Sequence, residues 1–587
     1  MIKIKLTPEE KRKKREDKKR IKEERQFKVD INTIFTNSSF NQIPTRNVQF
    51  KVLGRDCEID NIFLYENILV IAEDVARPDQ RDIKEHLLNK ANLFAFIIGH
   101  QQDFINAIVD KFPRFKEINN DKYSYDDMKL IFLYCSFYNI DEKYKERNEN
   151  IIFMERPRIQ YFVSLAKIIQ KSTKYELLKF LNIELCDIGH APSGEDNRKY
   201  DAILLPEKQS NFPKGNKIVT FLVEPERLLT QSYVLRKDGW RDRDCVYQRM
   251  LIDYKINEMR DHLASKGRVF VNNIIVTLPK NSSFYDEKGN QLTSSELMTR
   301  KTLKIQIPYE FNTIGIIDGQ HRIFAYYEGH EKDTREKKIK VLRDKQHLLV
   351  TGLIYQNECT DHEKTIFEAR LFLEINDKQS RAKGHLKQAI ATIVNPVSAI
   401  AISKEIINHL SRSGPLTNFL EEYFYDAGKI KTSSIVSYGL QYIVKFTDED
   451  TFYKYWGSKE KEKLKMLEET PTPLTAQEKE LLASYIVFCA NHINTFLKAF
   501  KDSIPPELWT LDKKTSHVLT TGTINSLIYC MRMLLQNNQL GGFENYKQGF
   551  AKLKNNPSLN FNEKLPFRSN QWKPLGETIY NTCFKEI

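Results

Sequence analysis

Residues 316–327 read IIDGQHRIFAYY, an apolar run that enters a polar turn and leaves it in a helical pattern. Thr313–Ile317 is short, apolar and largely β-branched, which predicts a buried strand. Ile323–Tyr327 predicts the first turns of a helix. Gly319 stands at the junction, where a side chain would obstruct a close backbone approach. The stretch therefore predicts a strand, a glycine turn and a helix N-terminus in succession.

This turn has the chemistry of an anion site, because the unpaired N–H groups and the dipole of a helix N-terminus point at one spot. Arg322 adds a planar cation suited to phosphate, and His321 titrates near neutral pH. Asp318 can bind a metal or cap the helix, and His321 can move a proton, donate to a phosphate or simply pack. We expect phosphate contacts from Gly319, Gln320 and Arg322, with Asp318 and His321 as the catalytic candidates.

Two further polar clusters accompany the turn. Tyr247-Gln248-Arg249 stands at the start of a helix expected over residues 246–263, and residues 372–381 follow a helix expected over residues 363–373. In the second cluster, Asn376 and Gln379 offer paired amide donors and acceptors. The alternatives are an exposed helix face for the first cluster and an ordinary polar loop for the second.

Together and in this order, the three clusters resemble the DGQHR-domain family, which includes the DndB-type proteins associated with DNA phosphorothioate modification. The resemblance rests on Asp318–Arg322, Tyr247–Arg249 and Phe372–Gln379, and it covers roughly residues 215–540. It implies a fold similar to that of ParB and sulfiredoxin, in which a helix and a strand precede a turn that binds nucleotide phosphates.

Defence enzymes with a related DGQQR signature are nucleotide hydrolases, so the resemblance implies NTP binding and leaves hydrolysis open. Carried over, Gly319 would approach the phosphates and Arg322 would pair with them, while Asp318 or His321 would assist metal or proton chemistry. The chain has His321 where those hydrolases have a second Gln. The further candidates for binding nucleotide or phosphate are Gln248, Arg249, Asn376 and Gln379.

The net charge supports a polyanionic partner. The 587 residues carry a formal charge of +13, with a pI near 9.0. Such a balance favours nucleic acid, although a merely basic protein is the alternative. Residues 11–28 form a dense basic segment without apolar residues at helical spacing. It predicts a solvated helix or a disordered arm that contacts phosphates, or else a solubilising tail.

A second candidate site lies in the first α/β segment. Glu58 and Asp60 are expected on one strand, and Glu73 ends the next. Carboxylates at adjacent strand ends can hold Mg²⁺, and a nearby Lys can orient the attacking water. The order of elements resembles the restriction-endonuclease-like fold, but Val75 stands where that fold has the Lys. Lys84 or Lys90 on the following helix could replace it. The alternatives are an active nuclease and a degenerate nuclease fold used for DNA binding or scaffolding.

Other signals are negative. The eight cysteines form no C-x-x-C pair, no apolar run reaches membrane-spanning length, and no signal peptide is recognisable. We therefore expect a cytoplasmic protein without a zinc site. The sequence also lacks the P-loop, H-E-x-x-H, G-x-S-x-G and G-x-G-x-x-G patterns.

The length predicts about three domains. We expect an α/β and α+β multidomain fold, with residues 191–215 as a linker and residues 331–345 as a charged loop. The expected parts are a basic N-terminal arm (1–45), a restriction-endonuclease-like α/β domain (46–190), a ParB/sulfiredoxin-like DGQHR domain (215–390) and a mainly helical C-terminal region (391–587).

The leading functional hypothesis is a DNA-associated protein of a DNA-modification or phage-defence system. Its turn would bind a nucleotide or DNA phosphates, and its partners would be DNA and proteins of the same locus. An oligomer is compatible with the sequence, whereas a membrane partner is not expected. The rivals are an NTP-dependent nuclease that uses Mg²⁺ and a catalytically inert adaptor.

Overall fold

The chain folds into two compact units. The computed structural model describes residues 8–77, 79–120, 122–189, 198–210, 212, 215–236, 239–241, 248–298, 301–355, 360–379, 384–423, 426, 428–469, 474–512, 515–561 and 571–585. The first unit comprises Met1–Arg241 and Met250–Cys359, and the second comprises Asp242–Arg249 and Thr360–Ile587. These units do not follow the predicted boundaries near residues 190–215 and 390. The coarse expectation of a mixed α/β protein with a helical C-terminal region is confirmed.

The first unit begins with a five-stranded mixed sheet of order β1-β4-β5-β6-β7. The pairs β1–β4 and β4–β5 are antiparallel, whereas β5, β6 and β7 run parallel. Every residue of β5 is buried, as expected for a strand covered on both faces. The strands are β1 (Asn41–Ile43), β4 (Asn61–Tyr65), β5 (Ile68–Val75), β6 (Lys129–Ser136) and β7 (Ile151–Glu155).

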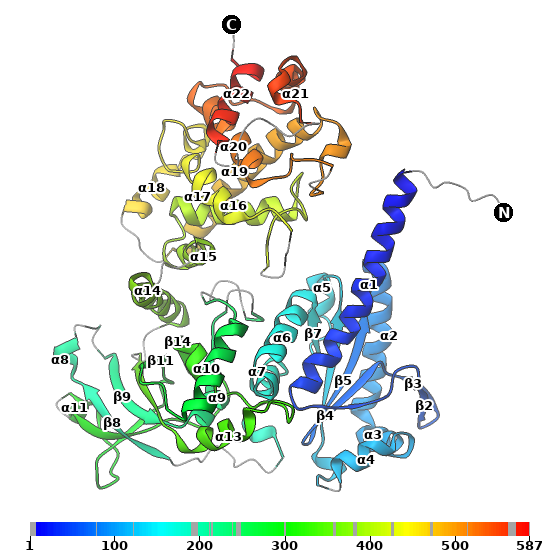
Figure 1. The fold of residues 1–587 in the computed structure, drawn as a ribbon, viewed down its shortest axis with the longest axis vertical. Helices are drawn as coiled ribbons and strands as arrows, with labels where there is room; N and C mark the ends of the chain where they lie inside the picture. Colours follow the sequence, from blue (N-terminus) through cyan, green and yellow to red (C-terminus); the bar gives the residue numbers. More distant parts are fainter. Residues whose placement is uncertain are drawn as a thin grey trace. The chain divides into compact units, whose positions relative to one another are not determined.

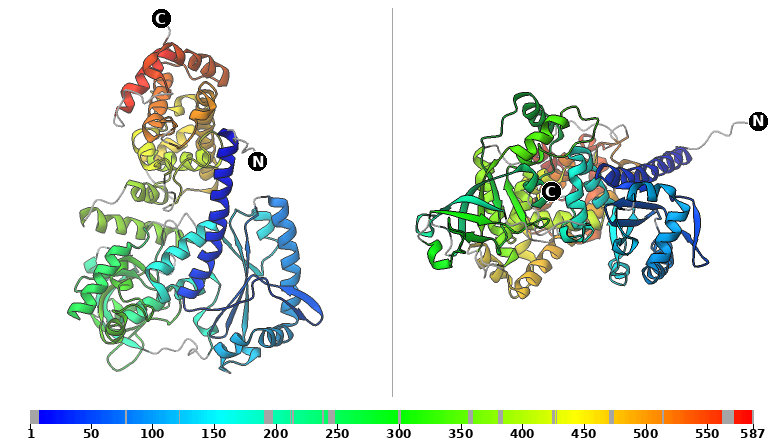
Figure 2. Two further views of the ribbon diagram at one scale, coloured as in Figure 1. Left: turned by 45° about the vertical axis from the view of Figure 1, so that its right-hand side comes forward. Right: turned by 90° about the horizontal axis from the view of Figure 1, so that it is seen from below.

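Helices cover both faces of this sheet. On one face, α1 (Pro8–Asn37) lies along α6 (Arg156–Ile168), as Figures 1 and 2 show. The opposite face is covered by α2 (Gln80–Gly99) and α3 (Gln101–Lys111), whose apolar residues share a core with the strands. Short helices follow at α4 (Pro113–Asn119) and α5 (Glu142–Lys145), and the hairpin β2 (Gln49–Val52)–β3 (Arg55–Glu58) forms a separate two-stranded sheet.

Helix α1 differs from the expected arm. Its C-terminal half carries Phe27, Ile31, Ile34 and Phe35 at helical spacing, and all four side chains are at most 2% exposed. They pack in the same core as the sheet residues Val70 and Leu133. The predicted basic segment of residues 11–28 lies in α1 and precedes most of these buried residues. Residues 1–45 are therefore not a separate arm, since their last third is part of the core.

The second sheet of the first unit has eight strands in the order β10-β14-β11-β15-β9-β8-β13-β12. Strand β14 runs antiparallel to β11 and parallel to the short β10. The strands are β8 (Lys199–Leu205), β9 (Lys217–Val223), β10 (Ser232–Tyr233), β11 (Ile274–Thr277), β12 (Ser283–Tyr285), β13 (Thr302–Gln306), β14 (Ile314–Asp318) and β15 (Leu348–Ile354). The accompanying helices are α7 (Thr173–Phe180), α8 (Glu207–Ser210), α9 (Pro225–Gln231), α10 (Asp253–Lys266), α11 (Ser294–Leu297), α12 (Gln320–Phe324) and α13 (Glu336–Lys345).

Two predictions about loops in this region are wrong. The supposed linker at residues 191–215 contains β8, whose alternating pattern buries Tyr200, Ala202 and Leu204. The supposed charged loop at residues 331–345 contains α13, which buries Ile339 and Arg343. Prolines and glycines in the first segment and abundant charge in the second hid a short periodic pattern of buried positions.

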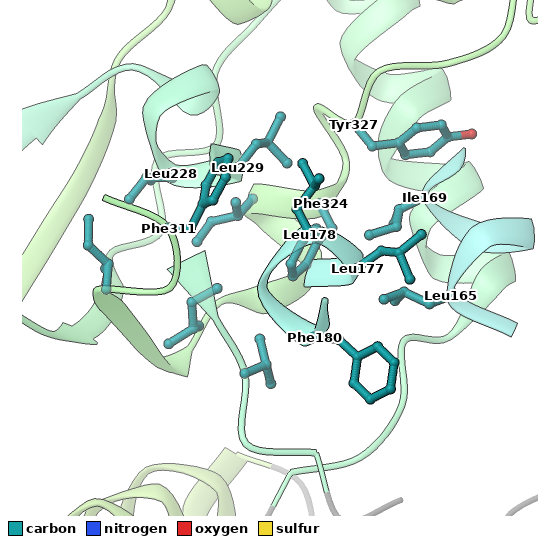
Figure 3. Close-up of a cluster of buried hydrophobic side chains, with 14 of the residues drawn as sticks. Leu165, Ile169, Leu177, Leu178, Phe180, Leu228, Leu229, Phe311, Phe324 and Tyr327 are labelled. Carbon is teal, nitrogen blue, oxygen red and sulfur yellow. The ribbon is translucent and has the colours of Figure 1, made fainter. Parts of the chain in front are cut away.

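One hydrophobic core joins the two sheets of the first unit. Figure 3 shows Leu177 and Leu178 of α7 among side chains from the preceding helix and from the second sheet's helices. Leu165 and Ile169 come from the α6 side, while Leu228 and Phe324 come from α9 and α12. The predicted boundary at residues 191–215 is therefore crossed by continuous packing.

The second unit is built around helices with a core of its own. Helix α19 contributes ten buried residues, from Leu482 to Phe500, to this core. No single helix in the described residues is long and apolar enough to span a bilayer, although the bent pair Leu386–Val394 and Ala399–Arg412 passes by length and composition. The helices are α14 (Asp361–Gln379), α15 (Gly384–Val394), α16 (Ala399–Arg412), α17 (Thr432–Tyr438), α18 (Lys461–Glu469), α19 (Ala476–Lys501), α20 (Thr521–Gln536), α21 (Phe543–Phe550) and α22 (Trp572–Cys583).

Candidate functional sites

The glycine turn of residues 318–322 joins β14 to α12, as the sequence predicts. Strand β14 ends at Asp318 and α12 begins at Gln320. Gly319 has φ +100°, a left-handed conformation that L-residues with a side chain rarely adopt. A Cβ atom on Gly319 would lie 3.0 Å from Arg322 Nη2 and 3.1 Å from Ile274 Cγ1. Glycine is thus required twice, once by the backbone angle and once by the approach of Arg322.

Arg322 folds back over this turn and pairs with Asp318. Its Nη2 donates to Asp318 Oδ2 at 2.7 Å, and the two side chains are 18% and 26% exposed. The Nε atom of Arg322 is buried and has no hydrogen-bond partner among the described residues. Asp318 makes no side-chain capping bond to α12, whose N-cap is Gly319. The carboxylate therefore holds the guanidinium in place, and the capping alternative is wrong.

His321 links the glycine turn to the start of helix α10. Its Nε2 accepts a hydrogen bond from the backbone N–H of Ile252 at 3.1 Å, directly before α10 begins. This bond requires an unprotonated Nε2. In this state His321 holds α10 against α12, and a role in proton transfer would require that bond to break. Gln320 is 7% exposed, so its side chain lies inside the unit and not on the open side of the turn.

The other predicted members of this site belong to the second unit. Gln248 is buried and Arg249 is exposed, and both precede α10 because that helix begins at Asp253 and not near Val246. Tyr247 lies outside the described residues. Asn376 and Gln379 lie on α14, but their side chains are also outside the described set. Whether these residues join the glycine turn stays a prediction.

A denser ionic cluster lies at the carboxyl end of β5. Glu73 is 1% exposed and lies opposite Tyr134 in the register of β5 with β6. Asp60 precedes β4, and its Oδ2 accepts a hydrogen bond from the backbone N–H of Asp74 at 3.1 Å. Lys90 of α2 reaches in, with its Nζ 2.9 Å from Glu73 Oε2. Of the two lysines that the sequence offered, Lys90 therefore contacts the carboxylate, whereas Lys84 is exposed.

Burial dominates the electrostatics of Glu73. Removal from water raises the pKa of Glu73 to about 8, with Asp60 raising it further and Lys90 lowering it. The Oε1 atom of Glu73 is buried without a hydrogen-bond partner among the described residues. At neutral pH this carboxyl is largely protonated as the structure stands. A strongly perturbed carboxyl beside a specific cation marks a candidate functional group.

The next residue, Asp74, is compensated from the opposite side of the sheet. Arg46 forms an ion pair with Asp74 and lies 3.7 Å from Asp60, and Lys28 of α1 lies 3.8 Å from Asp74. Burial raises the pKa of Asp74 although the bond from Arg46 opposes it. The cluster therefore contains three carboxylates, at residues 60, 73 and 74, and three cations, at residues 28, 46 and 90.

Glu58 does not belong to this cluster, which corrects the predicted set of Glu58, Asp60 and Glu73. Glu58 lies on the separate β2–β3 hairpin with an exposed side chain, and only its backbone carbonyl accepts a bond from Lys90, at 2.8 Å. Asp60 and Glu73 are brought together as predicted. In the part of the chain that the structure describes, no three His, Cys, Asp or Glu residues form a ready metal site.

Sequence reasoning missed Tyr134, which lies opposite Glu73 in the register of β5 with β6, and His86, which contacts Tyr134. His86 Nδ1 lies 3.0 Å from the hydroxyl of Tyr134, and burial lowers the pKa of His86 to about 4, with Arg77 and Lys90 lowering it further. His86 and Lys90 are four residues apart on α2, so they share one face of that helix. This spacing was the available signal, since both residues follow the acidic strand end.

Comparisons with protein-family models, with curated proteins and with solved structures find no match to this chain.

Proposed function

We propose that the chain is a DNA-associated protein of the DGQHR type, acting in a DNA-modification or phage-defence system, that binds a phosphate group at the turn of residues 318–322. The observation that carries the proposal is the left-handed Gly319 turn with Arg322 folded over it. A guanidinium has five N–H donors, and Asp318 engages Nη2. Nucleotide and DNA share the phosphate that the remaining donors would bind.

The surface of α1 supports DNA as the larger partner. Lys18, Lys19, Arg20, Lys22 and Arg25 are all exposed on this helix. Its N-terminal half projects beyond the sheet that its C-terminal half covers (Figure 1). Anchored in the core by the residues from Phe27 onward, the helix would present a rigid basic rod to the DNA backbone. Such contacts add affinity without reading sequence.

The test compares variants of the turn in two binding assays. Arg322→Ala should weaken ATP or inorganic phosphate binding in calorimetry by about tenfold or more, as expected for the loss of a charge-assisted bond. Arg268→Ala, which removes an exposed arginine elsewhere in the unit, is the matched control. Asp318→Asn should strengthen phosphate binding, because it frees the guanidinium. Equal binding by Arg322→Ala and wild type would refute a phosphate site at the turn.

DNA binding is measured separately, by fluorescence anisotropy of a labelled duplex at several salt concentrations. The affinity should fall steeply with salt, and charge reversal of Lys18, Lys22 and Arg25 should reduce the slope. Loss of DNA binding with phosphate binding intact would separate the two parts of the proposal. Failure of both phosphate and DNA binding would favour the inert adaptor.

The cluster at β5 favours a second candidate, a nuclease that uses Mg²⁺. The specific observation is Lys90 on Glu73 beside Asp60, since these groups have the chemistry of a nuclease centre without the usual sequence spacing. Two hard oxygen donors are present, the unpartnered Glu73 Oε1 and the partly exposed Asp60, and the ion's other ligands would have to come from water and the DNA phosphate. Bound there, Mg²⁺ would supply an activated water and a polarised phosphate.

Plasmid cleavage in Mg²⁺, with and without NTP, tests this candidate. Glu73→Gln and Lys90→Ala should abolish cleavage, whereas Glu58→Gln should leave it unchanged because Glu58 lies outside the cluster. Cleavage that survives Glu73→Gln would exclude this centre as its source. No cleavage by the wild type would leave the cluster as a buried ionic link between β5, α1 and α2.

A further inference from the structure

The second unit contains an apolar cavity that neither proposed activity uses. It has a volume of about 800 Å³ and lies between α14, α15, α16 and α19. This size lies within the range of small-molecule sites in proteins. Most of its wall is apolar, including Ile366, Phe367, Ile393, Val397, Leu482 and Ile486.

One polar atom of a residue that lines this cavity lacks a partner. Asn395 follows α15 and lines the cavity, and its side-chain Oδ1 is buried without a hydrogen bond to any described residue. A buried amide oxygen is an acceptor whose desolvation is uncompensated until a donor reaches it. This oxygen is buried away from the open space of the cavity, so it does not select the ligand as the structure stands.

The charged residues of the lining are unequally engaged. Glu405 accepts a hydrogen bond from Asn408 at 3.2 Å, and Glu363 accepts bonds from Thr360 N and Oγ1 at 2.9 and 2.8 Å. Arg370 and Lys479, by contrast, form no ion pair within the described ranges, and both are exposed. Within the described part of the chain, the cavity lining thus has two cations without an ion pair beside its apolar wall, and two carboxylates that accept hydrogen bonds from neutral neighbours.

We propose that this cavity binds a small amphipathic anion, with an apolar body against α14, α15 and α19 and an acidic group beside Arg370 and Lys479. The apolar wall supplies most of the affinity, because it is the larger surface removed from water. Among the described residues the two cations lack a carboxylate partner, so an acidic group on the ligand would form the ion pairs that they do not make there.

The experiment uses the full chain and two probes of equal chain length and opposite charge. Dodecanoate and dodecyltrimethylammonium are titrated below their micelle concentrations, each in competition with the fluorescent anion anilinonaphthalene sulfonate. Dodecanoate should displace the dye, and the cationic probe should do so at least about tenfold more weakly, as expected from one or two solvent-exposed ion pairs. Equal displacement by the two probes would overturn the proposal.

Variants locate the binding event. Arg370→Ala combined with Lys479→Ala should remove the preference for the anion, whereas Arg412→Ala combined with Lys465→Ala, the same loss of charge at exposed positions of α16 and α18, should keep it. Ala483→Trp places an indole at the exposed edge of the cavity on α19 and should block both probes. Dodecanoate binding that survives Ala483→Trp, or an unchanged preference in the first double variant, would place the ligand elsewhere and refute the assignment.

Discussion

Replacing Gly319 by alanine tests whether the turn geometry is as tightly determined as the structure indicates. The backbone at φ +100° costs a residue with a side chain about 1–2 kcal/mol or more. The new Cβ also meets Arg322 Nη2 at 3.0 Å and Ile274 Cγ1 at 3.1 Å, tighter than ordinary van der Waals contact. Arg322 can move, but only by weakening its bond to Asp318, and Ile274 is fixed in β11. The two effects together should cost about 2–4 kcal/mol.

Two other glycines of the first unit separate these contributions. Gly289 has φ +89°, and a Cβ atom there would have no neighbour within 4 Å, so Gly289→Ala should show the backbone cost alone. Gly99, in α2, has neither a left-handed φ nor a neighbour within 4 Å, so Gly99→Ala should be neutral or stabilising by up to about 1 kcal/mol. The measurement is local hydrogen exchange of the peptides around each substituted residue, which for Gly319 come from β14 and α12. A loss of about 3 kcal/mol accelerates exchange roughly a hundredfold. The exchange rate near each substitution is compared with that of the wild type. If Gly319→Ala accelerates exchange no more than Gly289→Ala does, the close approach of Arg322 is not a constraint.

Three further outcomes follow from buried groups in the first unit. Phe35→Ala should cost about 3–5 kcal/mol, measured by urea denaturation, because α1 is core at this residue, whereas Val29→Ala, at a 54% exposed position of the same helix, should cost less than about 1 kcal/mol. Glu73 has a folded-state pKa of about 8, above its ordinary value of 4.5, so the folded state binds the extra proton and stability should fall as pH rises from about 4.5 to 8. Glu73→Gln should remove that fall, which can reach about 4 kcal/mol; a parallel pH profile in the variant would contradict the assignment. Arg260→Met should cost about 1–3 kcal/mol in the same denaturation assay, because it leaves the buried carbonyl of Ala325 without its donor and removes one of the two cations that contact each of Asp333 and Glu336.

Local patterns in the sequence predicted the turn and most of the strands around it. The run from Thr313 to Ile317 and the glycine after it were sufficient, because a buried β-branched strand and a positive φ are each determined within a few residues. Strand β8 was missed because prolines and glycines flank it closely in the sequence, and helix α13 because only Ile339 and Arg343 of its ten residues are buried. The anchoring of α1 was missed for another reason: the dense charge before Phe27 masked the four apolar residues that follow at helical spacing.

The ionic partners within the candidate sites could be predicted less well. Lys90 was one of two lysines that the helix after Glu73 offered, and only the packing of α2 on the sheet decides between them. Arg46 and Lys28 approach Asp74 from segments 28 and 46 residues away along the chain, a proximity that no local pattern encodes. The partnership of Arg322 with Asp318 is local, at four residues, but the sequence permitted a capping role for Asp318 equally well.

The two candidate sites share one electrostatic property, and the kind of ligand proposed for each site depends on how exposed that feature is. At both, the cations are already paired with carboxylates: Arg322 with Asp318, and Lys90 with Glu73. The pair at residues 318 and 322 is partly open to solvent, so an incoming phosphate can compete for the guanidinium while the carboxylate turns toward water. The pair at residues 73 and 90 is closed, with Glu73 at 1% exposure, and an anion that took Lys90 would remove the cation that lowers the pKa of Glu73 and so disfavour its ionised form further. A cation that took Glu73 Oε1 would instead stabilise the ionised carboxylate and leave the contact with Lys90 in place. The proposals of an anionic ligand for the open pair and of a metal ion for the closed pair rest on this difference.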